Sequence, residues 1–182
     1  MNAGRKALFV DRDGVINVDR GYVYRIEDFE FLPGVPEALL SFQDNGFCIV
    51  VITNQSGIAR GLYRESQLAD LHDYMRRQLA SAGIELAGIY YCPHHPEAAR
   101  EQYREECRCR KPAPGMILDA VQELDIDLDH SILVGDSARD IEAGRAAGVD
   151  KCILLGTSEN DPGHGQFEGL LQFATHYLEQ HG

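Results

Sequence analysis

The stretch KALFVDRDG, residues 6–14, decides how this chain folds. Residues 7–10 form a short apolar run of the kind found in buried strands, and Asp11 and Asp13 follow where such a strand should end. A carboxylate at that place can serve as a nucleophile, a metal ligand or a proton carrier, depending on what approaches it. The rest of the sequence supplies possible partners in chain order: Thr53, Arg110 with Lys111, and Asp136 with Asp140.

Strand-like and helix-like segments alternate along the rest of the chain. The continuous β-branched runs that predict buried strands are residues 47–53, 131–135 and 151–155, with a weaker one at 86–91. Apolar residues at helical spacing predict helices over residues 36–45, 68–82, 117–124 and 137–147. This alternation is typical of an α/β fold. We therefore predict a single domain over residues 1–182, a three-layer, Rossmann-like, doubly wound fold with a mainly parallel sheet.

Two segments fit neither pattern, residues 14–34 and 92–114. Long irregular stretches in a compact domain are usually functional loops or disorder. Both follow predicted strands, so both should lie at the edge of the sheet where open α/β sheets bind ligands.

Composition narrows the range of partners. The formal net charge of −12 argues against nucleic acid or an anionic membrane as the main partner. The chain shows no apolar run long enough to span a membrane, and no secretory apolar region precedes Asp11. We expect a cytoplasmic monomer that acts on a small molecule.

The carboxylates at the predicted sheet edge call for a cation. Asp136 follows an apolar strand, as Asp11 does, and Asp140 comes one helical turn later. Like charges gathered at one edge are destabilising unless a cation neutralises them. Ligands that offer only oxygen suit a hard ion such as Mg²⁺, which commonly binds one or two carboxylates together with a substrate phosphate.

The remaining polar motifs resemble phosphate binders. The sequence TNQSG at residues 53–57 ends a predicted strand with hydroxyls, amides and backbone N–H groups. Arg110 and Lys111 add a guanidinium and an ammonium group just before Pro112 and Pro114, which keep this backbone out of a helix. Standing alone, the basic pair would be interpreted as solvated surface residues; together with the carboxylates it indicates phosphoryl chemistry.

The ordered set DRDG, TNQSG, RKP and GDSxxD resembles the haloacid dehalogenase superfamily of phosphotransferases. The longer strings VDRDGVIN, TNQSGIARG, YYCPHHP and CRCRKP resemble one branch, the D-glycero-D-manno-heptose 1,7-bisphosphate 7-phosphatases, and histidinol phosphatases share much of this pattern. The resemblance covers residues 6–155. It implies a Mg²⁺-dependent phosphomonoesterase that removes the 7-phosphate of a sugar bisphosphate and so supplies nucleotide-activated heptose for surface polysaccharide.

The resemblance also implies roles for the carboxylates. Asp11 would attack phosphorus and form an aspartyl-phosphate. Asp13 would protonate the leaving alkoxide and then deprotonate the attacking water. Mg²⁺ would be held by the Asp11 side chain, the Asp13 backbone carbonyl and Asp136, while Asp140 would support the site without touching the metal.

The same resemblance makes Thr53, Arg110 and Lys111 the residues that stabilise the phosphoryl oxygens. Some relatives carry Lys where this chain has Ser137, so no cationic contact is expected at that position.

The cysteine-rich loop, residues 92–109, indicates a second metal. Cys92, His94, Cys107 and Cys109 offer three thiolates and one imidazole, the donor set of a closed structural Zn²⁺ site. His95 is a rival ligand by composition, but His94 is the residue that matches the resembled pattern. The intervening residues are too polar to build a core, so zinc would order the loop and anchor the neighbouring Arg110.

Substrate contacts are expected from the loops, because the chain has no room for the separate cap domain that many relatives carry. Asp19, Arg20, Gly21 and Tyr22 match a segment that contacts substrate in the resembled branch, although Tyr22 and Tyr24 can equally pack against the loop's own apolar residues. Asp19 and Asn54 suit sugar hydroxyls, and Arg20 or Arg60 suits an anionic second phosphate. The substrate-binding candidates are Asp19, Arg20, Gly21, Tyr22, Asn54, Gln55 and Ser56.

Two alternative functions stay open. Histidinol phosphate could be the substrate, since the zinc loop does not separate the two branches, and neither anomer of the heptose is favoured by the sequence. A phospho-acceptor signalling domain would also use acidic residues after a first strand, but such domains phosphorylate an aspartate on a later strand, and the nearby Asp13 favours turnover over storage.

Overall fold

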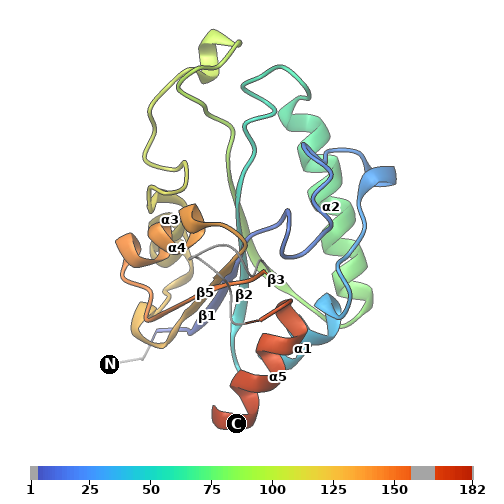
Figure 1. Cartoon of the computed structure of the whole chain (residues 1–182), viewed down its shortest axis with the longest axis vertical. Helices are drawn as coiled ribbons and strands as arrows, with labels where there is room; N and C mark the ends of the chain where they lie inside the picture. The colour runs from blue at the N-terminus through green and yellow to red at the C-terminus, as the bar shows by residue number, and fades with distance from the viewer. Residues whose placement is uncertain (1–3, 157–166, 182) are drawn as a thin grey trace.

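Five parallel strands form the central sheet of the computed structural model, which describes residues 4–156 and 167–181 (Figure 1). Their order across the sheet is β3-β2-β1-β4-β5. The strands are β1 (Ala7–Val10), β2 (Cys48–Asn54), β3 (Leu86–Cys92), β4 (Ile132–Gly135) and β5 (Lys151–Leu154). Every predicted strand is present, with ends that differ by one residue at most places.

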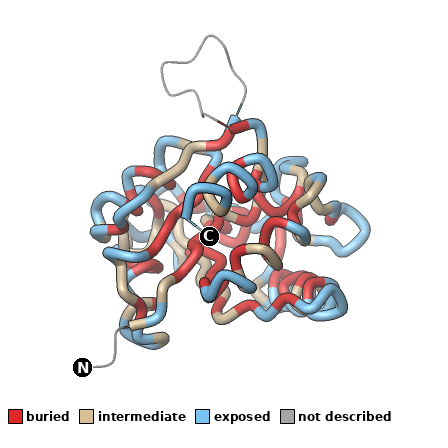
Figure 2. The backbone as a smooth tube through the Cα atoms, turned by 90° about the horizontal axis from the view of Figure 1, so that it is seen from below, coloured by how far each residue is buried: buried red, intermediate tan, exposed pale blue. Residues whose placement is uncertain are grey.

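Helices cover both faces of the sheet, as the doubly wound prediction requires (Figure 1). One layer contains α1 (Val35–Asp44), α2 (Glu65–Ser81) and α5 (Leu170–His181), and the other contains α3 (Gly115–Leu124) and α4 (Ala138–Ala147). Alternate strand residues serve the two layers: Leu8 and Val10 pack with the first, Ala7 and Phe9 with the second. All four are fully buried, which explains why the strand reads as a continuous apolar run. The buried backbone is accordingly concentrated in the middle of the molecule (Figure 2).

Helix α5 was not predicted from the sequence. Phe173 and Tyr177 pack against Phe42 of α1, with ring centroids 5.7 and 5.9 Å apart. The helix therefore owes its stability to aromatic packing on α1, and each buried aromatic side chain contributes about 1.5–3 kcal/mol. The two predicted loops contain only short 3₁₀ turns, at Ile26–Asp28 and Glu101–Tyr103.

Strand register brings the carboxyl ends of the strands to one edge. Val10 pairs with Val51 on one side and with Val134 on the other. The residues that follow these three strands therefore lie next to one another, and the described residues add no separate cap domain above them. Within the described ranges, no helix is both long and apolar enough to cross a membrane.

Candidate active site

Asp11, Thr53 and Asp136 meet at the carboxyl edge of the sheet, where the sequence placed them. The backbone N–H of Asp11 donates to the carbonyl of Val134 at 3.1 Å, so the ends of β1 and β4 stay paired up to the carboxylate. The Thr53 side chain is buried near the end of β2, and its hydroxyl accepts a hydrogen bond from Gln55 at 2.9 Å.

Lys111 lies at the centre of this edge, although it comes from the loop after the cysteines. Its Nζ is 3.0 Å from Asp11 Oδ1 and 2.6 Å from Asp140 Oδ1, and it donates to the carbonyl of Ile52 at 3.0 Å. Asn54 fixes the lysine backbone from both sides, because its amide donates to the Lys111 carbonyl at 3.1 Å and accepts from the Lys111 N–H at 3.0 Å. The ammonium group is thus held rigidly against the carboxylate predicted to be the nucleophile.

Three carboxylates, those of Asp11, Asp136 and Asp140, share one buried ammonium group, that of Lys111. Burial, together with the charges of Asp140 and Asp136, raises the pKa of Asp11 to about 7 even though Lys111 opposes the shift. Burial and the charge of Asp140 raise the pKa of Asp136 to about 6. Burial disfavours the charged form of Lys111, but Asp11 and Asp140 outweigh it and raise the pKa of the lysine.

These residues fit a magnesium ion. Asp11, Asp136 and Asp140 each offer an oxygen, and the three atoms lie within 4.8 Å of one another. Asp140 is already engaged by Lys111 and by the Ser137 hydroxyl, which donates to Asp140 Oδ2 at 2.6 Å. Asp11 and Asp136 therefore keep the free oxygens, and a set of oxygen donors alone suits Mg²⁺.

Gly14 leaves room for this carboxylate pair. A Cβ at Gly14 would lie 1.9 Å from Asp136 Oδ2, and the backbone φ of +85° is itself one that side chains rarely adopt. Glycine is therefore required here for two separate reasons, conformation and space.

Asp13 is held by a different set of donors, those of Arg12, Asn17 and Gln55. Arg12 Nη2 donates to both carboxylate oxygens at 2.8 and 2.9 Å, Asn17 Nδ2 to Oδ1 at 3.0 Å, and Gln55 Nε2 to Oδ2 at 3.0 Å. With 21% of its side chain exposed, Asp13 keeps access to the cavity in front of it.

A cavity of about 450 Å³ opens over this edge. Both loops contribute residues to its lining, together with the segment that follows β2 and the start of α4. The lining residues are Asp11, Asp13, Asp19, Gly21, Tyr22, Thr53, Asn54, Gln55, Ser56, Arg60, Tyr63, His95, Arg110, Lys111, Asp136, Ser137, Arg139 and Asp140.

Among the substrate-binding candidates, Arg20 stands apart. It does not line the cavity; its guanidinium is exposed and pairs with Glu30. Asp19, Gly21, Tyr22 and Ser56 do line the cavity. Tyr22 is 45% exposed, so it is not packed away inside its loop, whereas Tyr24 stacks on Tyr63 with ring centroids 4.8 Å apart.

Asn54 and Gln55 line the cavity, but protein groups occupy their side-chain amides. Asn54 holds the backbone of Lys111, and Gln55 donates to Thr53 and Asp13 while accepting from the Tyr63 hydroxyl at 2.5 Å. Their amides therefore position other residues of the site rather than stand free for a sugar.

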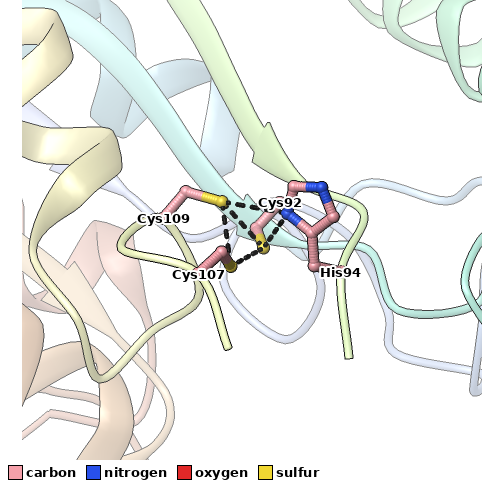
Figure 3. Close-up of side chains that lie close together, drawn as sticks. All are labelled: Cys92, His94, Cys107 and Cys109. Atoms are coloured by element: carbon pink, nitrogen blue, oxygen red, sulfur yellow. Dashed lines mark hydrogen bonds between the residues drawn. The ribbon is translucent and has the colours of Figure 1, made fainter. Parts of the chain in front are cut away.

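Four side chains of the cysteine loop converge on one point (Figure 3). The three sulfur atoms of Cys92, Cys107 and Cys109 lie 3.1–3.4 Å apart, and His94 Nδ1 lies 3.5 Å from Cys109 Sγ and 3.8 Å from Cys92 Sγ. Sulfur atoms about 2.3 Å from a shared tetrahedral ion would be about 3.8 Å apart, so the set is arranged compactly for Zn²⁺. Hydrogen bonding among the thiols lowers the pKa of Cys109 and raises the pKa of Cys92, so ionisation of one thiol is favoured at the expense of its neighbour.

The cysteine cluster is physically joined to the catalytic edge. Arg110 follows Cys109 directly, and its Nη1 donates to the carbonyl of His94 at 3.4 Å. Burial lowers the pKa of Arg110, with the charges of Arg139 and Arg60 acting in the same direction. Ordering the cluster therefore also orders a guanidinium that lines the cavity.

Comparison with known proteins identifies the family. The family model for HAD-like hydrolases matches residues 108–174. The D-glycero-beta-D-manno-heptose-1,7-bisphosphate 7-phosphatase of Photorhabdus laumondii is 48% identical over 87% of this chain and 85% of its own, and that of Vibrio cholerae is 51% identical over 85% and 83%. This chain belongs to the heptose 1,7-bisphosphate 7-phosphatase family.

Solved structures agree with this family assignment. The D,D-heptose 1,7-bisphosphate phosphatase of B. bronchiseptica, complexed with magnesium and phosphate, superposes with a TM-score of 0.82 at 34% identity over 96% of this chain and 99% of its own. A HAD-like phosphatase from Mesorhizobium loti gives 0.86 at 31% identity over 100% and 89%. The predicted family and α/β fold are thus confirmed, while the single-domain organisation, the monomeric state and the roles of individual residues stay predictions.

Several residues of this heptose phosphatase site were missed in the sequence. Arg12 stands between Asp11 and Asp13 in the sequence. Its side chain is fully buried, whereas a charged residue is expected at the surface. Arg139 of α4 and His95 of the cysteine loop line the cavity; no signal in the sequence marked Arg139, and His95 was indicated only as a rival zinc ligand. Tyr63 donates to Gln55 Oε1, and no signal in the sequence indicated this contact.

Proposed function

We propose that this chain hydrolyses the 7-phosphate of D-glycero-β-D-manno-heptose 1,7-bisphosphate, the activity for which its relatives are named. The observation that carries the proposal is the placement of Asp11 in the cavity lining, 3.0 Å from the ammonium of Lys111 and beside Asp136. A phosphoryl group entering this cavity meets a nucleophile, a buried cation and a carboxylate pair suited to Mg²⁺. The β-anomer is part of the proposal and rests on the names of the relatives.

Asp11 Oδ2 attacks phosphorus in the first step, while Oδ1 stays within reach of Lys111. The P–O bond to the sugar breaks, its electron pair goes to the leaving oxygen, and Asp13 delivers a proton there. In the second step Asp13 takes a proton from water, which attacks the aspartyl-phosphate and releases inorganic phosphate. Asp13 ends the cycle protonated, as it began.

Two cationic side chains and one hydroxyl stabilise the transferring group. Lys111 and Arg110 lie at the cavity, and the Thr53 hydroxyl lies beside them. When bound, Mg²⁺ would supply charge neutralisation on the phosphoryl oxygens, held by Asp11, Asp136 and the backbone carbonyl of Asp13. Zn²⁺ would brace the cysteine loop, with Cys92, His94, Cys107 and Cys109 as its ligands.

A second anionic group on the substrate finds cations at the mouth of the cavity. Arg60 and Arg139 line it, and Arg60 Nη2 lies 3.3 Å from His95 Nε2. A patch of this kind in a chain of net charge −12 favours a bisphosphate over a substrate with a single phosphate.

A side-by-side assay tests the proposal. The β- and α-anomers of heptose 1,7-bisphosphate and histidinol phosphate are each supplied with Mg²⁺, and kcat/KM is measured from phosphate release. We expect the β-bisphosphate to be the best substrate and Asp11→Asn to abolish turnover. Faster hydrolysis of histidinol phosphate would overturn the substrate, and a stable phospho-Asp11 without multiple turnovers would instead support a signalling domain.

A further inference from the structure

The Arg12 side chain is an unusual element of this site, because its guanidinium is wholly buried. It emerges between the nucleophile Asp11 and the proton carrier Asp13, yet points away from the cavity, which it does not line. Removing a guanidinium from water costs several kcal/mol unless its donors are matched by acceptors. Its partners therefore indicate what the buried charge achieves.

Arg12 connects three parts of the chain. Nη2 donates to both oxygens of Asp13 at 2.8 and 2.9 Å and to the carbonyl of Val23, in the loop of residues 14–34, at 2.6 Å. Nη1 lies 3.2 Å from His72 Nε2 on α2. The guanidinium is thus held by the Val23 carbonyl and by His72 on α2, and it in turn holds the carboxylate of Asp13.

His72 completes the arrangement as an acceptor. Burial and the neighbouring charge of Arg12 lower the pKa of His72 to about 3, so the imidazole is neutral and its Nε2 has a lone pair to offer. A neutral acceptor orients the guanidinium without competing with Asp13 for its charge.

We propose that Arg12 is a positioning residue that holds Asp13 in place and stabilises the negative charge that Asp13 acquires as it protonates the leaving oxygen. The inference rests on the acid–base role of Asp13 in the proposed function. As the proton leaves Asp13, the carboxyl becomes a carboxylate and its bonds to Arg12 become charge-assisted. Because these contacts strengthen during the step itself, they lower its barrier instead of only tightening binding.

Asn17 and Gln55 act with Arg12. Both are buried, and each donates one amide N–H to Asp13 at 3.0 Å. The Tyr63 hydroxyl donates to Gln55 Oε1 and so turns the amide nitrogen toward Asp13. The carboxylate therefore meets matched donors on the side that faces the protein interior, and its remaining access is to the cavity.

The experiment compares leaving groups. An alkoxide needs a proton as it departs, whereas 4-nitrophenolate departs without one. kcat/KM reports only steps up to loss of the leaving group, so it isolates the step in which Asp13 is the acid. We expect Arg12→Lys, which keeps the charge but loses the fork, to lower kcat/KM for a sugar phosphate about 10–100-fold and for 4-nitrophenyl phosphate by less than about 3-fold. The loss for the sugar phosphate is at most the roughly 100-fold lower end of what a general acid contributes, because Asp13 is still present.

A double-mutant cycle separates positioning from general damage. In an Asp13→Asn background there is no proton donor to position, so Arg12→Lys should cause no further loss for either substrate. Arg77→Lys, an exposed change on α2, is the matched control and should leave both rates unchanged. Equal losses for the two substrates, or a further loss in the Asp13→Asn background, would overturn the proposal.

Two milder variants cover the case in which Arg12→Lys does not fold. His72→Leu removes the acceptor for the fork and Asn17→Ser shortens a donor, and each should reproduce the leaving-group effect in the same direction at about 3–10-fold. A loss shared equally by both substrates in these variants would again reject the role. If the wild-type protein hydrolyses simple alkyl and aryl phosphates but not the heptose bisphosphate, the proposed substrate is wrong, and the cycle still tests Arg12 on the alkyl and aryl pair.

Discussion

Replacing Lys111 with Met removes the buried cation at the centre of the site while keeping the length of its stem. The lysine side chain is 3% exposed, and its ammonium lies 3.0 Å from Asp11 and 2.6 Å from Asp140, two carboxylates that would be left facing each other without it. Removing one partner of a buried ion pair typically costs 3–5 kcal/mol, so we expect Lys111→Met to lower the free energy of unfolding by about 4 kcal/mol at pH 8.5 without Mg²⁺.

The cost should depend on pH in a definite direction. The pKa of Asp11 is already raised to about 7 in the native protein, and loss of Lys111 raises it further. A carboxyl whose pKa is higher folded than unfolded favours folding only while it is protonated, so this contribution fades as pH rises through the folded pKa. Below about pH 7 both proteins hold Asp11 neutral; above it only the wild type has a cation for the carboxylate. The deficit should therefore be smaller by about 2 kcal/mol at pH 6.5 than at pH 8.5, at 1.4 kcal/mol per proton and pH unit.

Urea unfolding followed by far-UV circular dichroism measures this, since the chain contains no Trp to serve as a fluorescent probe. Lys151→Met is the matched control: the Lys151 side chain is 44% exposed and pairs with Asp150 at the surface, so its removal should cost less than about 1 kcal/mol. A deficit for Lys111→Met that is as small as the control's, or that is the same at both pH values, would refute the account of the buried triad.

Three further predictions follow from particular contacts. Gly14→Ala should push Asp136 aside, weaken the dependence of turnover on Mg²⁺ and lower kcat about 100-fold, as measured by Mg²⁺ titration of the rate. Cys107→Ser, or chelation of zinc, should lower metal content and, through the freed Arg110, phosphatase activity; unchanged turnover in zinc-free protein would show that the coupling is wrong. The pKa of His72 is about 3 in the folded protein and about 6.5 in the unfolded chain, so the wild type loses stability as the pH drops below 6.5. His72→Gln removes this group, and the variant should lose about 2 kcal/mol less stability than the wild type between pH 7.5 and pH 5. Thermal melts of both proteins at the two pH values measure this, and an equal loss in both would contradict it.

The sequence predicted the parts of this molecule whose cause is local. Continuous apolar strands such as residues 47–53 and the cap at Ser137, whose hydroxyl and N–H bind Asp140, can be identified from residue type and spacing. The convergence of Asp11 and Asp136 follows from strand order alone, because parallel strands present their carboxyl ends together.

What the sequence could not show depends on contacts between distant residues. Helix α5 lies against α1 through ring packing, and no local pattern identified Phe42 as its partner. Arg20 matched a substrate-contacting segment, but it forms an exposed ion pair with Glu30 and does not line the cavity. Asn54 has the chemistry of a sugar ligand, and only the fold reveals that its amide is used up on Lys111.

The two anchors of the cysteine loop have a consequence for how this enzyme can change over generations. One end leaves β3 at Cys92, and the other is fastened to β2 where Asn54 mimics a backbone partner for Lys111. The residues between Cys92 and Cys107 lie between these two anchors and are mostly exposed. Of these residues His95 lines the cavity, so a substitution there can change the cavity wall while Asn54 still holds Lys111. Selection for a new substrate can therefore act on this segment while the phosphoryl chemistry stays intact.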